Sequence, residues 1–412
     1  MVKTIVVIDN NATAAGGTAQ VAVASAIELS KQGKRVIFFA GPDGVCPQLR
    51  DSGVEVYTAG TYGINTDPNK LRAAVNGIWN SHNARALKKL LAMLDPESTI
   101  VHIHGYIHYL SVSIFKVCKD MGFWTVLTLH DYFTACPCGG FYDYGAKKIC
   151  KRKPMSLQCM ACNCDKRSYF QKIWRMVRQL FVNHYVRFNR SLNFIYISQF
   201  SYSKIKPWLA GQKIYFVRNP YDLGDETIYE AEKNTDYLFV GRLSEEKGVD
   251  IFCEAMSALL KEGAIRGRAI VIGEGACRTE YQKRYPQIGF AGWKTHGEMK
   301  EYISHARALV FPSRWYETAG LTPIEFMAHG IPCVVSNCCA SVEYIHNGKD
   351  GLLFERENVE DLKSKVRLAE KDAFWGVLAG ELRSTFSRDE YSAQSHVKSL
   401  IQVYERIANH TD

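Results

Sequence analysis

Short apolar runs alternate with helix-like segments along this 412-residue chain, and the alternation occurs twice. In parallel sheets that are covered by helices on both faces, strands read as continuous apolar runs of this kind. The first series of expected strands consists of Thr4–Ile8, Val36–Phe39, Thr99–Ile103 and Trp124–Leu129. The second series consists of Asp236–Val240, Arg268–Ile272, Leu309–Phe311 and Cys333–Val335. The pattern predicts an α/β protein with two doubly wound parallel sheets.

The composition is typical of an ordinary globular enzyme. Hydrophobic residues make up 47% of the chain and charged residues 23%, which excludes an intrinsically disordered protein. No apolar stretch approaches the roughly 20 residues that cross a bilayer, and the first residues read as a strand rather than as a leader. We therefore expect a cytoplasmic protein whose 13 cysteines are mostly thiols or metal ligands.

Two carboxylates, Glu317 and Glu325, stand eight residues apart around a glycine-containing turn. The apolar run Ala308–Phe311 before them reads as a strand, and Glu325 opens a helix-like segment after the turn. Backbone amides at a helix N-terminus attract phosphate, and the expected amides are those of Ala319, Gly320 and Leu321. The flanking carboxylates can accept hydrogen bonds from hydroxyls on either side of that phosphate. The pattern therefore indicates a nucleotide-sugar site.

The order of motifs in the second half resembles that of glycosyltransferase family 4, the group 1 glycosyl transferases of polysaccharide biosynthesis. The matching segments are Val240–Gly248, Val271–Gly275, Phe290–Gly292, Glu317–Val335 and Asn347–Leu353. The resemblance implies a retaining enzyme of GT-B fold, in which two Rossmann-like domains face each other across the active-site cleft. It also implies an acceptor-side domain at residues 1–215 and a nucleotide-sugar-binding domain at residues 216–387. The last segment, residues 388–412, is expected to pack back on the first domain.

The same resemblance implies roles for single residues. Arg242 and Lys247 follow a strand and would neutralise the diphosphate, although cations in such a place can also be solvated surface groups. Glu325 would bind the ribose and Glu317 would lie at the transferred sugar, the alternative being carboxylates that cap a helix. His130 ends a strand and would point at the donor sugar, unless it is a structural histidine.

Glycines complete the expected donor site. Gly16 and Gly17 would let the backbone approach the donor closely, although a flexible loop reads the same way. Gly273 would form one wall of the nucleotide pocket. The chain lacks G-x-G-x-x-G after its first strand, which argues against a dinucleotide cofactor. It also lacks the Asp-x-Asp motif, so we expect no catalytic metal and a leaving group that is stabilised by protein cations.

Six of the cysteines fall in the polar, basic segment 136–164. A loop with little apolar content gains order from a metal or a crosslink, and Cys159 and Cys162 have the spacing of a zinc knuckle. The expected ligands of a structural zinc are Cys136, Cys150, Cys159 and Cys162. Cys138 or Cys164 could replace one of them, and free thiols or disulfides are the alternatives to zinc.

The segment Lys166–Leu192 contains seven Lys or Arg residues and no acidic one. Its apolar residues recur at helical spacing: Phe170, Ile173, Trp174, Val177, Leu180 and Phe181. A basic amphipathic helix can lie on an anionic membrane surface, and the net charge of +9 points the same way. The alternative is that the apolar stripe packs on the sheet while the basic residues are solvated. No nucleic-acid-binding motif accompanies the basic charge.

Together these patterns predict a retaining, hexosyltransferase-type glycosyltransferase that moves a sugar from a nucleotide-diphosphate sugar to a glycan hydroxyl. The expected acceptor is a lipid-linked oligosaccharide of bacterial O-antigen, capsule or exopolysaccharide synthesis, reached at the inner face of the plasma membrane. One alternative is a non-catalytic nucleotide-sugar-binding or zinc-stabilised scaffold, against which the intact charged motif argues. The other is an NAD-dependent Rossmann oxidoreductase, against which the missing glycine fingerprint argues.

Overall fold

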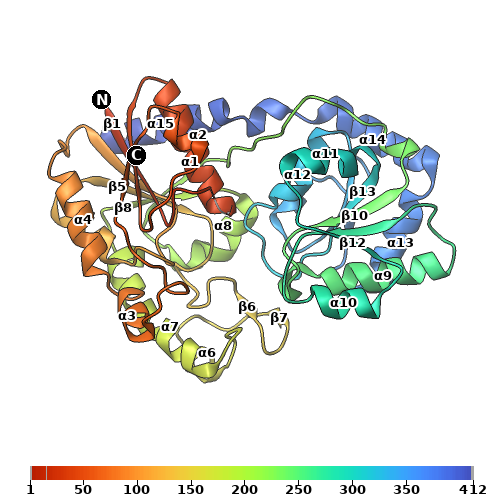
Figure 1. Ribbon diagram of the computed structural model, residues 1–412, viewed down its shortest axis with the longest axis horizontal. Helices are drawn as coiled ribbons and strands as arrows, with labels where there is room; N and C mark the ends of the chain where they lie inside the picture. The colour runs from red at the N-terminus through yellow and green to blue at the C-terminus, as the bar shows by residue number, and fades with distance from the viewer. Residues whose placement is uncertain (1, 15, 410–412) are drawn as a thin grey trace.

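The computed structural model describes residues 2–14 and 16–409. These residues form two lobes, each built around one parallel sheet with helices packed against it (Figure 1). The predicted α/β class with two doubly wound sheets is confirmed, and each predicted series of apolar runs supplies strands to one sheet.

The N-terminal domain holds a seven-stranded parallel sheet in the order β3-β2-β1-β4-β5-β8-β9. Its strands are β1 (Thr4–Asp9), β2 (Arg35–Ala40), β3 (Glu55–Thr58), β4 (Thr99–Ile103), β5 (Trp124–Leu129), β8 (Leu192–Tyr196) and β9 (Lys213–Phe216). The edge strands β3 and β9 are partly exposed, so the apolar signal that reveals β1 is weak in them. The strand order reverses between β1 and β4, where open sheets of this kind form a ligand crevice.

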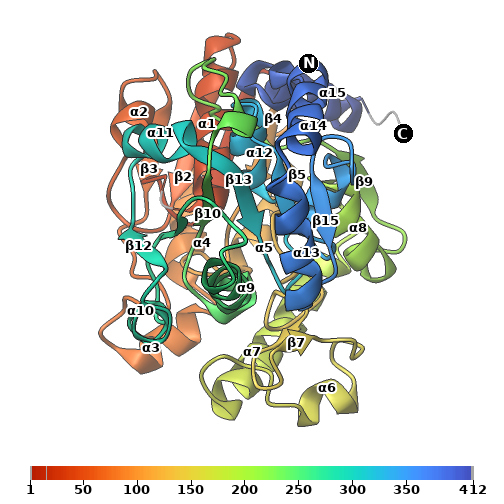
Figure 2. The ribbon, with the colours of Figure 1, turned by 90° about the vertical axis from the view of Figure 1, so that its right-hand side faces the viewer.

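The helices of this domain cover both faces of the sheet. They are α1 (Gly17–Lys31), α2 (Pro47–Arg50), α3 (Lys70–Asn76), α4 (Ser81–Leu91), α5 (Ser113–Asp120) and α8 (Gln199–Ile205). Between β5 and β8 the chain forms an insertion that projects from the domain (Figure 2). It contains β6 (Tyr142–Asp143), β7 (Lys148–Ile149), α6 (Leu157–Ala161) and α7 (Tyr169–Val182). Within residues 2–14 and 16–409, no helix is both long and apolar enough to cross a bilayer.

Helix α7 turns its apolar stripe outward. Four of the predicted stripe residues are exposed: Phe170, Ile173, Val177 and Leu180. Lys172 and Arg178 are buried instead. The stripe lies beside α3, because Trp174 Nε1 donates a hydrogen bond to the Ala74 carbonyl at 3.0 Å. Phe181 packs against the domain core, and Lys166 and Arg167 are exposed, so the interpretation of a stripe that packs on the sheet holds only in part.

The C-terminal domain holds a six-stranded parallel sheet in the order β12-β11-β10-β13-β14-β15. Its strands are β10 (Asp236–Val240), β11 (Ala269–Ile272), β12 (Gly289–Gly292), β13 (Ala306–Phe311), β14 (Cys333–Ser336) and β15 (Leu352–Phe354). Its helices are α9 (Val249–Lys261), α10 (Arg278–Arg284), α11 (His296–Ser304), α12 (Leu321–Ala328), α13 (Val359–Ala369) and α14 (Asp372–Thr385).

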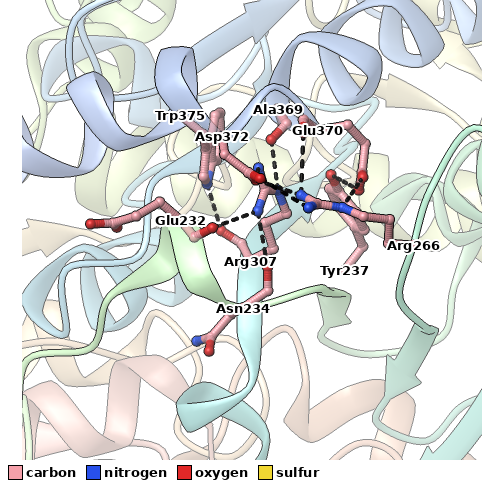
Figure 3. A network of polar contacts seen from close by, with 9 residues as sticks. All are labelled: Glu232, Asn234, Tyr237, Arg266, Arg307, Ala369, Glu370, Asp372 and Trp375. Carbon is pink, nitrogen blue, oxygen red and sulfur yellow. Dashed lines mark hydrogen bonds and ion pairs between the residues drawn. The ribbon is translucent and has the colours of Figure 1, made fainter.

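A fully buried arginine, Arg307 on β13, ties the helical layer to this sheet (Figure 3). Its guanidinium donates to the carbonyls of Ala369 (2.6 Å) and Asn234 (3.0 Å) and pairs with Asp372 (2.8 Å). Trp375 Nε1 in turn donates to the Arg307 carbonyl at 2.9 Å. Asp372 is itself half exposed, so the carbonyl contacts hold the buried part of the guanidinium. This network makes β13 a rigid support for the loop that follows it.

The last helix, α15 (Ala393–Ala408), returns to the N-terminal domain (Figure 1). Val397 and Tyr404 belong to the core cluster that contains Val7 of β1 and Ala26 of α1. The Tyr404 hydroxyl also lies 2.6 Å from His102 Nδ1 on β4. Of the segment 388–412 that was expected to pack back, α15 makes this contact, and residues 410–412 lie outside the described residues.

Side-chain hydrogen bonds join the two domains across the cleft. Thr318 Oγ1 donates to the His130 carbonyl (2.9 Å), and Ser198 Oγ donates to the Thr318 carbonyl (2.6 Å). The Glu343 carboxylate accepts the N–H of Gln199 at the start of α8 (3.0 Å). The linker 217–230 has neither helix nor strand. The two domains are therefore joined at several places, by Thr318, by Glu343 and by the ion pair of Lys147 with Glu245 (2.7 Å).

Candidate functional site

The strand–turn–helix motif of the C-terminal domain faces the cleft. β13 ends at Phe311, and α12 begins at Leu321 after Gly320, which has φ +66°. This left-handed conformation favours glycine, and a Cβ at Gly320 would also lie 2.9 Å from the Tyr344 hydroxyl. The amides predicted to attract phosphate, those of residues 319–321, do lie at a helix N-terminus. Glu325 falls in the second turn of α12, so the prediction that it opens the helix is wrong.

Glu317 and Lys247 meet beside this helix. Glu317 is only 8% exposed; its Oε1 contacts Lys247 Nζ and accepts a hydrogen bond from Ser313 Oγ at 3.1 Å. Lys247 comes from the loop after β10, which ends at Gly248 with φ +71°. A Cβ at Gly248 would collide with the Pro312 carbonyl. The glycine therefore lets the two loops approach and brings the predicted cation and carboxylate together.

Arg242 lies on the same loop as Lys247. Its guanidinium pairs with Glu246 Oε1 at 2.6 Å, and its side chain is 61% exposed. Gly273, at the end of β11, has φ +136°, and a Cβ there would collide with the Gly241 carbonyl. Two glycines thus let the ends of β10 and β11 approach each other. They place Arg242 and Gly273 at neighbouring strand ends of the C-terminal sheet.

Glu325 has surroundings unlike those of Glu317. His296 Nδ1 on α11 lies 3.4 Å from Glu325 Oε1. Burial raises the pKa of the Glu325 carboxyl, and the charge of a protonated His296 opposes that effect. One carboxylate therefore contacts a lysine, and the other lies beside a histidine.

The glycine pair of the N-terminal domain lies opposite α12. Gly16 has φ +93° and precedes α1, whose first residue is Gly17. A Cβ at Gly17 would stand 3.6 Å from Leu321 Cδ1, the first residue of α12. The loop before α1 and the first turn of α12 are therefore neighbours across the cleft.

His130 follows β5 and is paired with a second histidine. Its Nε2 lies 3.0 Å from His104 Nδ1, and the two rings are stacked. Burial lowers the pKa of His130 to about 3, so the ring is neutral at physiological pH. Its carbonyl accepts the Thr318 hydroxyl from the other domain. His130 is therefore fixed beside the residue that follows Glu317.

A pocket of about 430 Å³ opens at the carboxyl ends of β1, β4 and β5. Gly16 and Gly17 line it, together with Asp9, His104 and Asp131. Sequence reasoning missed Asp9 and His104 as site residues. Their positions in the sequence are a usable signal, because each stands at the end of an apolar run. The ends of neighbouring parallel strands meet at one edge of a sheet, where ligands bind.

A second hollow, of about 350 Å³, lies between the domains. The predicted residues Ala319 and Leu321 line it from the C-terminal domain, and Gln199 and Arg218 line it from the other side. The charged residues predicted from the sequence line neither of the two pockets: Arg242, Lys247, Glu317 and Glu325. Lys247 and Glu317 nevertheless lie near the domain boundary, because Thr318, next in sequence to Glu317, contacts His130 of the other domain. Arg218 is a further cation at the cleft that the sequence did not reveal.

The cysteine-rich insertion places thiols around a buried lysine. Lys172 Nζ lies 3.0 Å from Cys164 Sγ and 3.5 Å from Cys159 Sγ, and Cys138 Sγ lies 3.7 Å from Cys164 Sγ. Cys162 Sγ donates to Asp143 at 3.2 Å. Over the described ranges 2–14 and 16–409, no three metal-binding side chains are placed to hold an ion. In this arrangement a zinc ion does not fit the four predicted ligands, Cys136, Cys150, Cys159 and Cys162.

Comparison with known proteins identifies the C-terminal half first. The family model described as Glycosyl transferases group 1 matches residues 226–391, which contain both charged loops and α12. An uncharacterised 41.2 kDa protein in the cps region of Klebsiella pneumoniae is 25% identical over 183 residues, or 44% of this chain and 49% of that protein. The uncharacterised glycosyltransferase MJ1607 of Methanocaldococcus jannaschii is 23% identical and covers 79% of this chain and 80% of its own length. The lipopolysaccharide core biosynthesis mannosyltransferase LpsB of Rhizobium meliloti is 33% identical over 140 residues, 31% of this chain and 38% of LpsB.

Solved structures extend the likeness to the whole chain. Anabaena Alr3699/HepE, crystallised with UDP and glucose, superposes with a TM-score of 0.66 at 13% identity, covering 98% of this chain and 100% of that one. Sucrose-phosphate synthase from Thermosynechococcus elongatus gives a TM-score of 0.71 at 17% identity, covering 99% and 100%. At these identities the likeness shows the fold alone. The group 1 model thus matches residues 226–391, and the chain as a whole has the GT-B fold.

Proposed function

We propose that the chain is a retaining glycosyltransferase that moves a sugar from a nucleotide-diphosphate sugar to a glycan hydroxyl. The observation that carries this proposal is the contact between Lys247 Nζ and Glu317 Oε1 at the start of α12. It brings a cation, a carboxylate and a helix N-terminus to one place. A diphosphate flanked by hydroxyls needs these three groups. The group 1 family match over residues 226–391 supports the same reading.

Arg242 and Lys247 are the proposed ligands of the diphosphate. Without a ligand each contacts a carboxylate, Glu246 or Glu317. A diphosphate would recruit both cations, and they would neutralise the charge that develops on the leaving oxygen as the sugar bond breaks. Because the sequence lacks Asp-x-Asp, no catalytic metal is part of this proposal.

The transferred sugar is proposed to lie between Glu317 and His130. Thr318 joins these two residues, because it follows Glu317 in sequence and donates to the His130 carbonyl. A neutral His130 can exchange hydrogen bonds with sugar hydroxyls without adding charge. The configuration is retained if the acceptor attacks from the face that the diphosphate leaves. The departing phosphate oxygen would then take the proton of the acceptor hydroxyl.

Uridine diphosphate sugars are the first donors to test, because structures of the similarly folded HepE contain UDP and UDP-glucose. The proposed acceptor is a lipid-linked oligosaccharide of O-antigen, capsule or exopolysaccharide synthesis. Two relatives support this choice, the cps-region protein of Klebsiella pneumoniae and LpsB of Rhizobium meliloti. The proposed place of reaction is the cytoplasmic face of the plasma membrane.

An exposed apolar face formed by α3 and α7 supports contact with that membrane. On α3, Leu71 is 82% exposed and Val75 is exposed one turn later. On α7, Phe170 is 78% exposed and begins the outward stripe described above. Exposed Lys166 and Arg167 precede the stripe and can meet anionic headgroups. With Lys172 buried, this binding would depend more on apolar insertion than on charge.

A structural zinc in residues 136–164 stays a proposal that rests on cysteine spacing alone. Forming the site would require Cys159 to leave Lys172 and Cys162 to leave Asp143. Elemental analysis of protein purified without added metal should give about one zinc per chain. The Cys159→Ser variant should contain none. Metal-free protein with full protease resistance in this segment would remove zinc from the proposal.

A donor panel tests the function most broadly. Uridine, guanosine and adenosine diphosphate sugars are added singly, and thermal unfolding and sugar release are measured. One donor should raise the melting temperature, because a ligand that binds only the native state stabilises it. The Arg242→Ala variant should lose that shift. If every donor leaves both the wild-type melting temperature and the sugar release unchanged, the proposal fails.

A further inference from the structure

The pocket between β1, β4 and β5 is lined by buried polar atoms that no protein group satisfies. Asp9 is 1% exposed and His104 is 4% exposed. Within the described residues, Asp9 Oδ1, His104 Nε2 and the Tyr106 hydroxyl have no hydrogen-bond partner. Leaving such a group unsatisfied destabilises the folded protein, and buried polar groups in native proteins are nearly always bonded. Three of them around one pocket indicate a polar ligand.

The backbone around these atoms keeps the pocket open. Gly105 separates His104 from Tyr106, and a Cβ there would collide with Asp9 Oδ1 and with the side-chain amide of Asn10. The side-chain oxygen of Asn10, Oδ1, accepts a hydrogen bond from the backbone N–H of His108 at 3.0 Å, which holds two lining residues of the pocket together. The volume of about 430 Å³ lies within the usual range for ligand pockets, about 300–1,000 Å³.

The charge of the lining selects the class of ligand. Its ionisable groups include the carboxyls of Asp9 and Asp131 and the imidazoles of His104 and His108, and its lining residues include no lysine or arginine. Burial raises the pKa of Asp9 to about 7 and that of Asp131 to about 6, and it lowers the pKa of His108 to about 4. Near neutral pH such a lining both donates and accepts hydrogen bonds and offers no cation to an anion. Uncharged hydroxyls match it.

We infer that this pocket holds an uncharged terminal sugar of the acceptor, hydrogen-bonded by Asp9 and His104. The inference rests on the proposed glycosyltransferase function and adds the acceptor's charge class to it. The pocket lies next to the proposed sugar site, since His104, which lines the pocket, has its Nδ1 3.0 Å from His130 Nε2. Gly17 lines the pocket and faces Leu321 of α12, so the pocket opens beside the diphosphate site. Acceptors that end in a uronic acid or a phosphorylated sugar are excluded.

The test uses matched pairs of small probes. Methyl glucoside, galactoside and mannoside are each compared with the corresponding methyl uronoside, by saturation-transfer NMR and by the imidazole signals of the histidines. Uridine diphosphate is kept at saturation in every sample, so that the nucleotide site is filled and no probe binds there. At least one neutral hexoside should bind and shift histidine signals, and its uronoside should bind about tenfold more weakly.

Variants of Asp9 separate hydrogen bonding from charge. Asp9→Ala should weaken the binding of the neutral probe by about tenfold or more. Asp9→Asn keeps the shape of the side chain and should bind the neutral probe within about threefold of the wild type. The ratio of neutral-hexoside affinity to uronoside affinity should become smaller. Asp51→Asn, on the exposed surface of the same domain, is the matched control and should change nothing. Uridine diphosphate binding, measured in parallel, should stay intact in all three variants.

The possible outcomes distinguish a failure of the pocket inference from a failure of the proposed function on which it rests. If uridine diphosphate binds but uronosides bind as well as the neutral probes, or Asp9→Ala leaves the neutral probe unaffected, the pocket inference is wrong and the transferase proposal stands. If no nucleoside diphosphate binds the wild-type chain at all, the transferase proposal itself fails.

Discussion

The two walls of the cleft differ in the way they present charge. In the C-terminal domain Arg242 and Lys247 stand at the cleft, paired with carboxylates of neighbouring loops. In the N-terminal domain the pocket is lined by buried Asp9 and neutral histidines, with no cation among its lining residues. One wall is built for an anion and the other for an uncharged polar group. Under the proposed function, the two halves of the transfer reaction would fall on two domains that share one architecture.

This difference also explains where sequence motifs occur. A diphosphate has the same charge and size in every nucleotide sugar, so loops that bind it can keep one pattern. The family match accordingly covers residues 226–391, which contain Arg242, Lys247 and α12. In the proposed division the acceptor sugar would vary from enzyme to enzyme, so that its ligands at the strand ends would need no shared pattern.

Removal of the cations should have the largest effect. Arg242→Ala or Lys247→Ala should lower turnover about a hundredfold or more, because each removes a charge that stabilises the leaving diphosphate. Lys283→Ala, on the exposed surface of the same domain, is the control. Steady-state rates with the donor found in the panel measure the effect. Near-normal rates in both variants would show that the charged wall does not bind the diphosphate.

Asp9 should reduce stability as the pH rises. Its pKa of about 7 in the folded protein lies above the ordinary value of 3.8, so folding favours the protonated form. The free energy of unfolding therefore falls as the pH rises from about 4 to about 7, by up to about 4 kcal/mol. Asp9→Asn should lack this loss. The free energy of unfolding should therefore fall less between pH 4 and pH 8 in the variant than in the wild type. Parallel urea titrations at the two pH values measure it, and an unchanged difference would show that Asp9 is not buried as described.

The two carboxylates of the charged wall should separate in their effects. Glu325→Gln should weaken the binding of the free nucleoside diphosphate about tenfold through lost ribose contacts. Glu317→Gln should leave that binding nearly unchanged and lower the turnover number instead, because Glu317 lies toward the transferred sugar. Calorimetric binding and initial rates are compared for both variants. Equal nucleotide affinity in Glu325→Gln and the wild type would remove the ribose role.

The apolar face on the N-terminal domain should give the smallest effect. Phe170→Ser combined with Ile173→Ser should lower cosedimentation with anionic vesicles about fivefold, since the insertion loses two exposed apolar groups. Val377→Ser, equally exposed but on α14, is the control. Binding should persist in part at high salt, because burial of Lys172 and Arg178 leaves fewer cations at the face. Vesicle binding that is unchanged in the double variant would place the membrane contact elsewhere.

The sequence predicts what periodicity and short motifs encode. Buried strands such as β1 and β13 are readable because both their faces are covered. The contact of Lys247 with Glu317 follows from glycines that let loops approach, and those glycines stand in the motif. Long-range packing decides the rest. The sequence shows that helix α7 has an apolar stripe. It does not show that most of this stripe faces solvent, because that depends on how α7 packs against α3 and the cysteine-rich segment.

Two site residues were missed for the same reason. Asp9 and His104 belong to no motif and are adjacent only because β1 pairs with β4. Glu325 was placed one turn too early in its helix, because an apolar run does not mark the residue at which a left-handed glycine starts it. The cysteine spacing predicts four zinc ligands, and it cannot show that the buried ammonium of Lys172 lies among the thiols. Sequence spacing carries no information about such a partner from another helix.

Calorimetric titration of uridine diphosphate into three proteins tests the division between the walls most directly. The wild type and Asp9→Asn should bind it with the same affinity, within about twofold, whereas Arg242→Ala should bind about a hundredfold more weakly. That result would place the diphosphate on the C-terminal wall and leave the N-terminal pocket to the acceptor. Loss of affinity in Asp9→Asn with retention in Arg242→Ala would contradict the account.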